Sequence, residues 1–224
     1  MDGSSVIGAL SSADRNRLLD RSVERRLGPG EILHLAGDRP DRIHLLVEGV
    51  VKLTLRDSEG EETILGLAPP GTIVGDIAAV DGRHQPLDAV AATPVTARGI
   101  DADLFIDIVF ADPTAALELS RLQAARARWV VETALERTSG EVTARLAGRL
   151  LDLGRMLGTQ HGEQIMMNLP LGQRDLGKLA GMCRESTCKT LRRLKADGVV
   201  DYEGRKLRIL RPDTLRMMRC GAGD

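Results

Sequence analysis

The segment 171–194, with the sequence LGQRDLGKLAGMCRESTCKTLRRL, constrains the fold more than any other part of the chain. Apolar and small side chains recur at three- and four-residue spacing on both sides of Gly181, which predicts two short amphipathic helices over 173–180 and 184–196. Their buried faces are expected to consist of Leu176, Leu179, Ala180, Thr187, Leu191 and Leu194. Two such helices joined by a tight turn are typical of a helix-turn-helix, with a plain helical hairpin as the alternative.

The exposed face of the second predicted helix carries polar side chains suited to DNA. When the first turns of such a helix enter the major groove, Arg and Lys donate to O6 and N7 of guanine, and Glu accepts from N4 of cytosine. This face therefore predicts a DNA-reading helix. The candidate DNA-binding residues are Arg184, Glu185, Ser186, Cys188, Lys189 and Arg192.

Charge is distributed unevenly along the chain. Residues 170–224 contain 13 Lys and Arg against 7 Asp and Glu, a net charge of about +6, and the rest of the chain contains 18 against 25. The near-neutral total of −1 therefore hides a basic C-terminal quarter. A basic segment beside an acidic remainder predicts that the C-terminal part faces phosphate and that the N-terminal part does not.

Composition narrows the class of protein. Aromatic residues make up 2% of the chain, which argues against a base-stacking surface for RNA or single strands. The sequence has no apolar run of membrane-spanning length and no signal-like N-terminus, so we expect no membrane partner and a cytoplasmic location. The cysteines, Cys183, Cys188 and Cys220, lack metal-ligand spacing, which predicts reduced thiols and no metal site.

In residues 31–99 the spacing of apolar residues becomes typical of β-strands. Short runs rich in Ile, Leu, Val and Thr alternate with Gly- and Pro-containing turns, a spacing that predicts an antiparallel barrel or roll. The expected strands are 31–35, 42–48, 50–55, 62–67, 72–74, 89–92 and 95–99. The expected helices are 12–20 with Ser12 as its cap, 101–110, 114–139 and 141–157. A hairpin of 199–202 and 206–210, turning at 203–204, predicts a wing after the helix-turn-helix.

The order of these parts resembles that of the cyclic-AMP receptor protein/FNR family of bacterial transcription regulators. Three local sequences carry the resemblance: RIHLLVEGVVKLTL at 42–55 around Gly49, PPGTIVGDIAAV at 69–80, and GMCREST at 181–187. The resemblance implies an α+β chain with an N-terminal antiparallel β-roll similar to cyclic-nucleotide-binding domains, a long dimerisation helix and a C-terminal winged helix-turn-helix. The implied domains are a sensory roll over 1–113, a dimerisation helix and hinge over 114–140, and a DNA-binding domain over 141–224.

The same resemblance implies a function. The protein is expected to regulate transcription as a homodimer that binds palindromic double-stranded DNA, with RNA polymerase as a further partner. Arg184 and Glu185 match family positions that read a G·C-containing half-site, so TGTGA-like arms are expected. Lys189 stands where the family commonly has Arg, and the loss of the bidentate fork predicts looser discrimination at that base pair.

The expected effector pocket departs from the cyclic-nucleotide pattern. The family's glycine-acid pair is kept, whereas apolar residues stand in place of its phosphate-clamping Arg-Ser and its purine-contacting Thr-Ser. The residues of this degenerate pocket are Gly75, Asp76, Pro86, Leu87, Val130 and Val131. Burying a phosphodiester without an arginine costs several kcal/mol. Cyclic AMP in the usual pose is therefore not expected, and Arg83 as a displaced clamp is the alternative.

Three interpretations of effector control stay open. In the first, the roll is filled by its own side chains and the protein binds DNA constitutively, without a cofactor. In the second, the roll takes an apolar or planar ligand; haem is one case, because His84 lies one position from the axial histidine of a haem-binding relative. In the third, Cys183, which replaces the serine that usually caps the recognition helix, is a redox switch. The plainer alternatives are a solvated His84 and an inert Cys183.

Other classes of protein fit the sequence less well. A cyclic-nucleotide-binding regulatory module without DNA binding is the nearest alternative. In this sequence, however, the nucleotide-binding motif is degenerate and the DNA-binding helix-turn-helix motif is intact. An enzyme is not predicted, because the sequence lacks a Ser-His-Asp order, paired catalytic carboxylates and a G-x-x-x-x-G-K loop. His34 and His44 are expected to be surface or strand residues. The expected dimer seam on the long helix draws on Ala116, Leu119, Gln123, Ala127, Val130 and Ala134.

Overall fold

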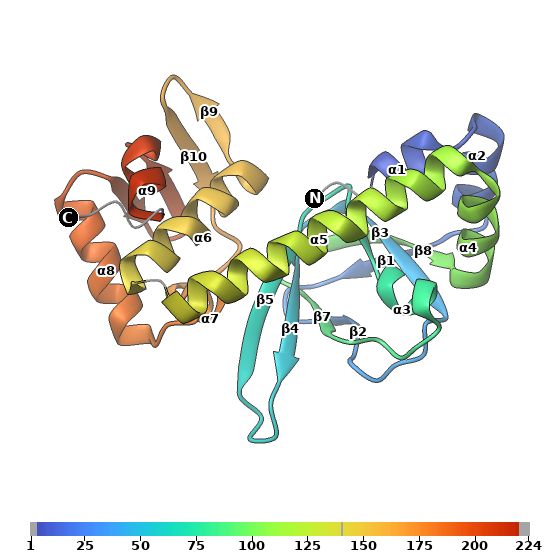
Figure 1. Cartoon of the computed structure of the whole chain (residues 1–224), viewed down its shortest axis with the longest axis horizontal. Coiled ribbons are helices and arrows are strands. Elements are labelled where there is room, and N and C mark those ends of the chain that lie inside the picture. The colour runs from blue at the N-terminus through green and yellow to red at the C-terminus, as the bar shows by residue number, and fades with distance from the viewer. Residues whose placement is uncertain (1–3, 140, 220–224) are drawn as a thin grey trace. The chain divides into compact units, whose positions relative to one another are not determined.

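The computed structural model describes residues 4–139 and 141–219, and Figure 1 labels most of their helices and strands. Within these residues the chain forms two compact units. The first ends at Val130 and the second begins at Val131, apart from Glu62–Ile64, which group with the second. This division falls inside the long helix, and the domain boundaries expected at 113 and 140 stay a prediction.

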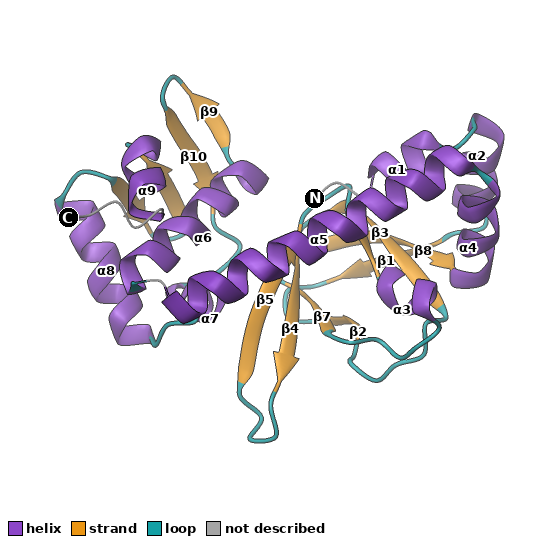
Figure 2. Ribbon diagram, in the orientation of Figure 1, coloured by secondary structure: helices purple, strands orange, loops and turns teal. Residues whose placement is uncertain are grey.

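The N-terminal unit is built on two four-stranded sheets, with strand orders β1-β8-β3-β6 and β2-β7-β4-β5 (Figure 2). β8 lies antiparallel between β1 and β3, and β7 lies antiparallel between β2 and β4. The strands are β1 Val23–Leu27, β2 Ile32–His34, β3 Arg42–Glu48, β4 Val51–Arg56, β5 Glu62–Ala68, β6 Ile73–Val74, β7 Asp88–Ala91 and β8 Val95–Asp101. The predicted antiparallel roll is confirmed.

Gly49, in the turn between β3 and β4, is the glycine around which the first of the three local sequences is arranged. Its φ is +80°, and a Cβ at this position would lie 2.0 Å from the carbonyl oxygen of Pro94. Backbone atoms occupy the space that any side chain would need, and the positive φ disfavours other residues. A glycine at this position therefore lets the β3–β4 turn lie against the start of β8.

Helices pack on the first sheet of the roll. They are α1 Ser4–Ala9, α2 Ser12–Asp20, α3 Asp76–Asp81, α4 Ala102–Ala111 and the long α5 Pro113–Ser139. One apolar core joins α1, α2 and α4 to the β1-β8-β3-β6 sheet, with Phe105 of α4 fully buried in it. Leu119 and Leu122 belong to the same core, so the first half of α5 is anchored to the roll.

The start of α2 differs from the prediction by one residue. Ser11, not Ser12, is its N-cap, and the Ser11 hydroxyl accepts a hydrogen bond from the backbone N–H of Asp14 at 3.1 Å. The assignment of Ser12 was wrong because two serines in a row offer the same local signal. Backbone geometry alone decides which of the two caps the helix.

The C-terminal unit is a winged helix-turn-helix. Its helices are α6 Val142–Leu157, α7 Gln173–Ala180, α8 Arg184–Ala196 and α9 Pro212–Arg219. Its strands, β9 Thr159–His161, β10 Gln164–Asn168, β11 Val200–Glu203 and β12 Lys206–Ile209, form a sheet in the order β11-β12-β10-β9. The β11–β12 hairpin follows α8 and is the predicted wing, which confirms the expected α+β class.

Several short elements were missed by the sequence analysis: α1, α3, α9, β1, β9 and β10. β1 has the sequence VERRL and buries only Leu27, so it lacks the alternation of a strand. β9 is exposed along its whole length. These strands form because they pair with β8 and β10, a tertiary event that local pattern does not report.

Candidate functional site

The helix-turn-helix has the buried and exposed faces that the sequence predicted. All six residues of the expected buried faces are buried: Leu176, Leu179, Ala180, Thr187, Leu191 and Leu194. Gly181 takes φ +63° in the turn. Of the candidate DNA-binding residues, Arg184, Glu185, Lys189 and Arg192 are exposed, while Ser186 and Cys188 are half-buried. The structure thus presents four charged side chains on one exposed helix and keeps its apolar side packed.

Close packing of α7 on α8 depends on Gly177. A Cβ on Gly177 would lie 2.6 Å from the Thr187 hydroxyl oxygen and 3.0 Å from the Met182 carbonyl oxygen. The Thr187 hydroxyl donates to the carbonyl oxygen of Cys183 at 2.9 Å. Cys188 links the two helices, because its thiol donates to Oε1 of Gln173 at 3.1 Å. The sequence analysis missed both Gly177 and Gln173 as residues that set the position of α8.

The C-terminal end of α8 is tied to the wing. Nζ of Lys195 lies 2.9 Å from Oδ1 of Asp201 and donates to the carbonyl oxygen of Tyr202 at 3.1 Å. It also lies 5.0 Å from the centre of the Tyr202 ring. Hydrogen bonds from Lys195 and Arg208 lower the pKa of Asp201 to about 2. The recognition helix is therefore held at both ends, by α7 and by β11.

Cys183 is the N-cap residue of α8 and is exposed. Its side chain makes no capping hydrogen bond to the helix. Its sulfur lies 3.2 Å from the hydroxyl oxygen of Ser186, and this hydrogen bond lowers the pKa of the thiol. A thiol at a helix N-terminus with a lowered pKa forms the reactive thiolate more readily than an ordinary cysteine.

In the roll, the acidic residue of the cassette is paired with the chain's own long helix. Asp76 lies at the start of α3 and is 1% exposed. Its Oδ2 accepts hydrogen bonds from Nη1 of Arg126 at 2.5 Å and from Nε2 of Gln123 at 2.7 Å. Arg126 also donates from Nη2 to the carbonyl oxygen of Ile73 at 2.9 Å. These four residues join α3, β6 and α5 within the N-terminal unit.

Arg126 and Gln123 were not among the expected pocket residues. The expected dimer seam was wrong at Leu119, which is 2% exposed in the core of the roll, while Gln123 contacts Asp76. The only local signal was that Gln123 and Arg126 are polar residues three positions apart and so lie on one face of α5. It had no visible partner in the sequence, since Asp76 and Arg126 are 50 residues apart.

The other expected pocket residues are less enclosed. Pro86 is exposed and Leu87 half-buried, and Val130 and Val131 are 57% and 58% exposed on α5. Only the Gly75–Asp76 part of the expected set lies in a closed environment. Gly75 takes φ +93°, which allows the chain to enter α3 with Asp76 pointing inward to its partners.

His34 and His44 are strand residues, which is one of the two expected placements, but His44 is buried. The two imidazoles lie on β3 and β2 with ring centres 6.3 Å apart, and His44 is 3% exposed. Their Nδ1 atoms are buried without a hydrogen-bond partner in the described part of the chain. Burial, followed by the nearby His34, Arg25 and Arg42, lowers the pKa of His44 to about 3.

The remaining candidate ligands are dispersed. His84 and Arg83 are exposed in the loop after α3. Among residues 4–139 and 141–219, no cluster of three or more His, Cys, Asp and Glu side chains is arranged for a metal ion. No helix in the same residues is long and apolar enough to cross a membrane. Cys220 lies outside the described residues.

A β-roll, a long helix and a winged helix-turn-helix with an exposed, charged recognition helix define a DNA-binding regulator. Residues 24–112 match the family model of the cyclic nucleotide-binding domain, and residues 144–218 match that of the Crp-like helix-turn-helix domain. The chain belongs to the Crp/Fnr family of transcription regulators.

Named relatives share both parts of the chain. The CRP-like cAMP-activated global transcriptional regulator of Mycobacterium tuberculosis is 27% identical over 190 residues, covering 85% of this chain and 84% of the relative. The transcriptional activator protein FnrA of Stutzerimonas stutzeri is 23% identical over 200 residues, covering 89% and 82%. The solved structure of FixK2 from Bradyrhizobium japonicum has a TM-score of 0.80 at 22% identity, covering 88% of this chain and 96% of that one.

Proposed function

We propose that this protein is a sequence-specific transcription regulator that binds palindromic double-stranded DNA as a homodimer. The observation that carries the proposal is the geometry of α8, whose apolar face is buried against α7 while Arg184, Glu185, Lys189 and Arg192 are exposed. Their donors and acceptors match the major-groove edges of G·C pairs. The proposed half-sites are TGTGA-like, and RNA polymerase is the proposed downstream partner in the cytoplasm. The protein acts by binding, not by catalysis.

The proposed dimer uses an exposed stripe of α5. Leu117, Ala124 and Val131 recur at seven-residue spacing, and Leu117 and Val131 are 49% and 58% exposed. Apolar residues repeated at this spacing on an exposed helix are typical of coiled-coil contacts. Two-fold pairing along α5 would present two copies of α8 about 34 Å apart, one helical turn of DNA.

We further propose that DNA binding does not require cyclic AMP. The Asp76 carboxylate is already satisfied by Arg126 and Gln123. The Arg126 guanidinium is committed to Asp76 and to the Ile73 carbonyl oxygen, so it is not positioned to pair with a cyclic phosphate. This internal pair supports the interpretation in which the roll is filled by its own side chains.

Replacing Arg184 with alanine is expected to weaken binding to a TGTGA-armed palindrome by about 5- to 150-fold, because a bidentate arginine–guanine contact contributes about 1–3 kcal/mol. Fluorescence anisotropy of a labelled palindrome and of a scrambled duplex measures the change. The protein is kept reduced, at near-physiological salt, with and without cyclic AMP. The loss should be large on the palindrome and small on the scrambled duplex.

Arg17→Ala, an exposed arginine on α2 of the roll, is the matched control and should bind as the wild type does. Wild-type protein that fails to prefer the palindrome with or without cyclic AMP contradicts the proposed half-site. Selective binding only in the presence of cyclic AMP contradicts the proposed effector independence. Cyclic-AMP binding without any DNA binding would favour the regulatory-module rival.

Redox gating through Cys183 is the second candidate, favoured by the exposure of this thiol and its lowered pKa. Hydrogen peroxide would convert the thiolate to a sulfenate with release of water, placing a bulkier, negatively charged group at the start of α8. A negative group beside the DNA phosphates weakens binding. Haem and apolar ligands have no comparable observation in their favour.

Ser186→Ala is expected to raise the pKa of the Cys183 thiol, because it removes the hydrogen bond that lowers it. The rate of iodoacetamide alkylation as a function of pH, in a C188S/C220S background, measures this pKa. The midpoint should move upward in the Ser186→Ala variant. An unchanged midpoint, or peroxide sensitivity of DNA binding that survives Cys183→Ser, contradicts the redox candidate.

A further inference from the structure

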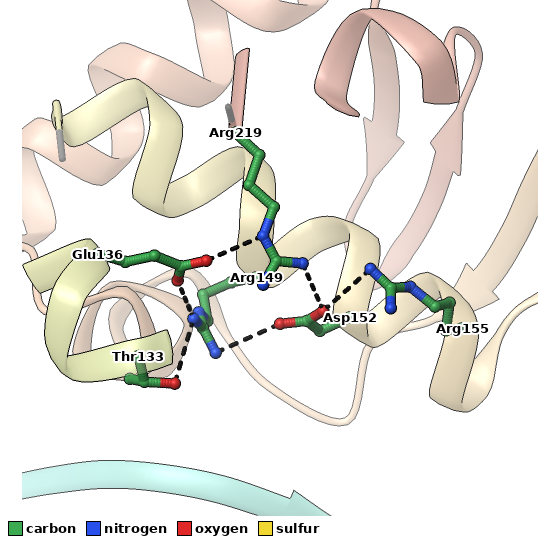
Figure 3. A network of polar contacts seen from close by, with 6 residues as sticks. All are labelled: Thr133, Glu136, Arg149, Asp152, Arg155 and Arg219. Carbon is green, nitrogen blue, oxygen red and sulfur yellow. Dashed lines mark hydrogen bonds and ion pairs between the residues drawn. The ribbon is translucent and has the colours of Figure 1, made fainter. Parts of the chain in front are cut away.

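A network of buried and half-buried charges joins the last turns of α5 to α6 and α9 (Figure 3). Arg149 of α6 pairs with Glu136 of α5 and, at 3.3 Å, with Asp152 of α6. Arg219 of α9 pairs with the same two carboxylates, at 2.9 Å from Glu136 and 3.1 Å from Asp152. Two guanidinium groups and two carboxylates therefore alternate, and each carboxylate contacts both cations.

One of the four side chains is buried and the other three are half-buried. The side chain of Arg149 is 5% exposed, and those of Glu136, Asp152 and Arg219 are 19%, 21% and 22% exposed. Gly148 of α6 lies beside the network, where a Cβ would be 3.4 Å from both Nε of Arg219 and Oε1 of Glu136. Salt screens partly buried ion pairs of this kind less than it screens pairs on the surface.

Stability alone is a weak reason for such a network. Burying charges costs solvation energy, and apolar packing of similar volume often stabilises as well as a buried ion pair does. Charge-assisted hydrogen bonds to guanidinium groups differ from apolar contacts in being directional. Directional contacts between α5, α6 and α9 suit a role in fixing the angle between the end of α5 and the winged helix-turn-helix.

We propose that Glu136, Arg149 and Arg219 are positioning residues for DNA binding, which hold the winged helix-turn-helix at one angle to the end of α5 so that the dimer selects one spacing between half-sites. The inference rests on the proposed function. It assigns a role in specificity to residues that are far in sequence from the recognition helix and that do not read bases.

Half-site spacing is a sensitive readout of this angle. One base pair added between two half-sites turns one of them by about 34–36° around the duplex axis, because B-DNA completes a turn in about 10–10.5 base pairs. A rigidly held pair of recognition helices cannot follow that rotation, whereas a loosely held pair can. A role confined to stability would lower binding to all duplexes together and leave the spacing preference unchanged.

The experiment first uses the wild-type protein to select its preferred palindrome from a randomised duplex pool. Affinity is then measured for that palindrome, for versions with the spacer lengthened or shortened by one and two base pairs, and for a single half-site. The variants are Glu136→Gln, Arg219→Gln and Arg149→Met, with far-UV circular dichroism as the test of folding. The matched control is Arg155→Gln, because Arg155 lies 3.5 Å from Asp152 but is 69% exposed.

Wild type and Arg155→Gln are expected to lose about tenfold in affinity for each base pair of spacer change. Glu136→Gln and Arg219→Gln should lose about threefold or less, while their affinity for the single half-site stays within about twofold of the wild type. If both variants keep the wild-type spacing profile, or lose affinity for every duplex equally, the inference is overturned and the proposed function stands. If the wild type selects no palindrome, both are overturned.

Discussion

Replacement of Arg126 with methionine is expected to lower the free energy of unfolding of the N-terminal unit by about 3 kcal/mol, because it leaves the buried Asp76 carboxylate without its cationic partner. Asp76 is 1% exposed, so its carboxylate cannot turn to water when the guanidinium is removed. Urea unfolding followed by the fluorescence of Trp129 measures the loss. This residue is the only tryptophan of the chain, and a Cβ on Gly66 of β5 would lie 3.5 Å from its ring.

The matched control is Arg128→Met, an exposed arginine on the same helix, which should change the free energy of unfolding by no more than about 0.5 kcal/mol. The double variant Arg126→Met/Asp76→Asn should be more stable than Arg126→Met alone, because no buried charge is left unpaired. Wild-type stability of Arg126→Met would show that the pair does not hold α5 to the roll. The proposed independence from cyclic AMP would then lose its structural support.

Lowering the pH from 7 to 5 is expected to reduce the free energy of unfolding of the N-terminal unit by about 2 kcal/mol through His44 alone. Burial lowers the pKa of His44 from 6.5 to about 3 in the folded protein. Below pH 6.5 the unfolded chain takes up a proton at this imidazole, whereas the folded chain stays neutral until the pH approaches 3. Acid therefore favours the unfolded state throughout this window.

The pKa of His34 is also lowered, chiefly by burial, so His34 adds to the effect in the same direction. Urea unfolding at pH 7 and at pH 5 measures the difference, and a His44→Gln variant corrects for the carboxylates that titrate in the same range. The variant should show a pH dependence smaller by about 2 kcal/mol. Equal pH dependence in the variant and the wild type would contradict a neutral, buried His44.

The local sequence pattern was sufficient to predict the helix-turn-helix and most strands of the β-roll. The period of apolar residues around Gly181 located α7 and α8, because helices of this length are defined by hydrogen bonds within four positions and by one buried face. Alternating runs and turn glycines such as Gly49 located the strands that bury a face in the core. Strands without a buried face, such as β1 and β9, carried no such signal.

The sequence by itself determined the order of the parts, the recognition helix and the class of protein. Tertiary structure alone decided which charges meet: Asp76 with Arg126 across 50 positions, and Glu136 with Arg219 across 83. It also decided that Leu119 packs into the roll and is not part of a dimer seam. The physical reason is that an ion pair between distant residues needs no local period or spacing. It depends on where the packed cores bring the helices together, and only the folded chain specifies that.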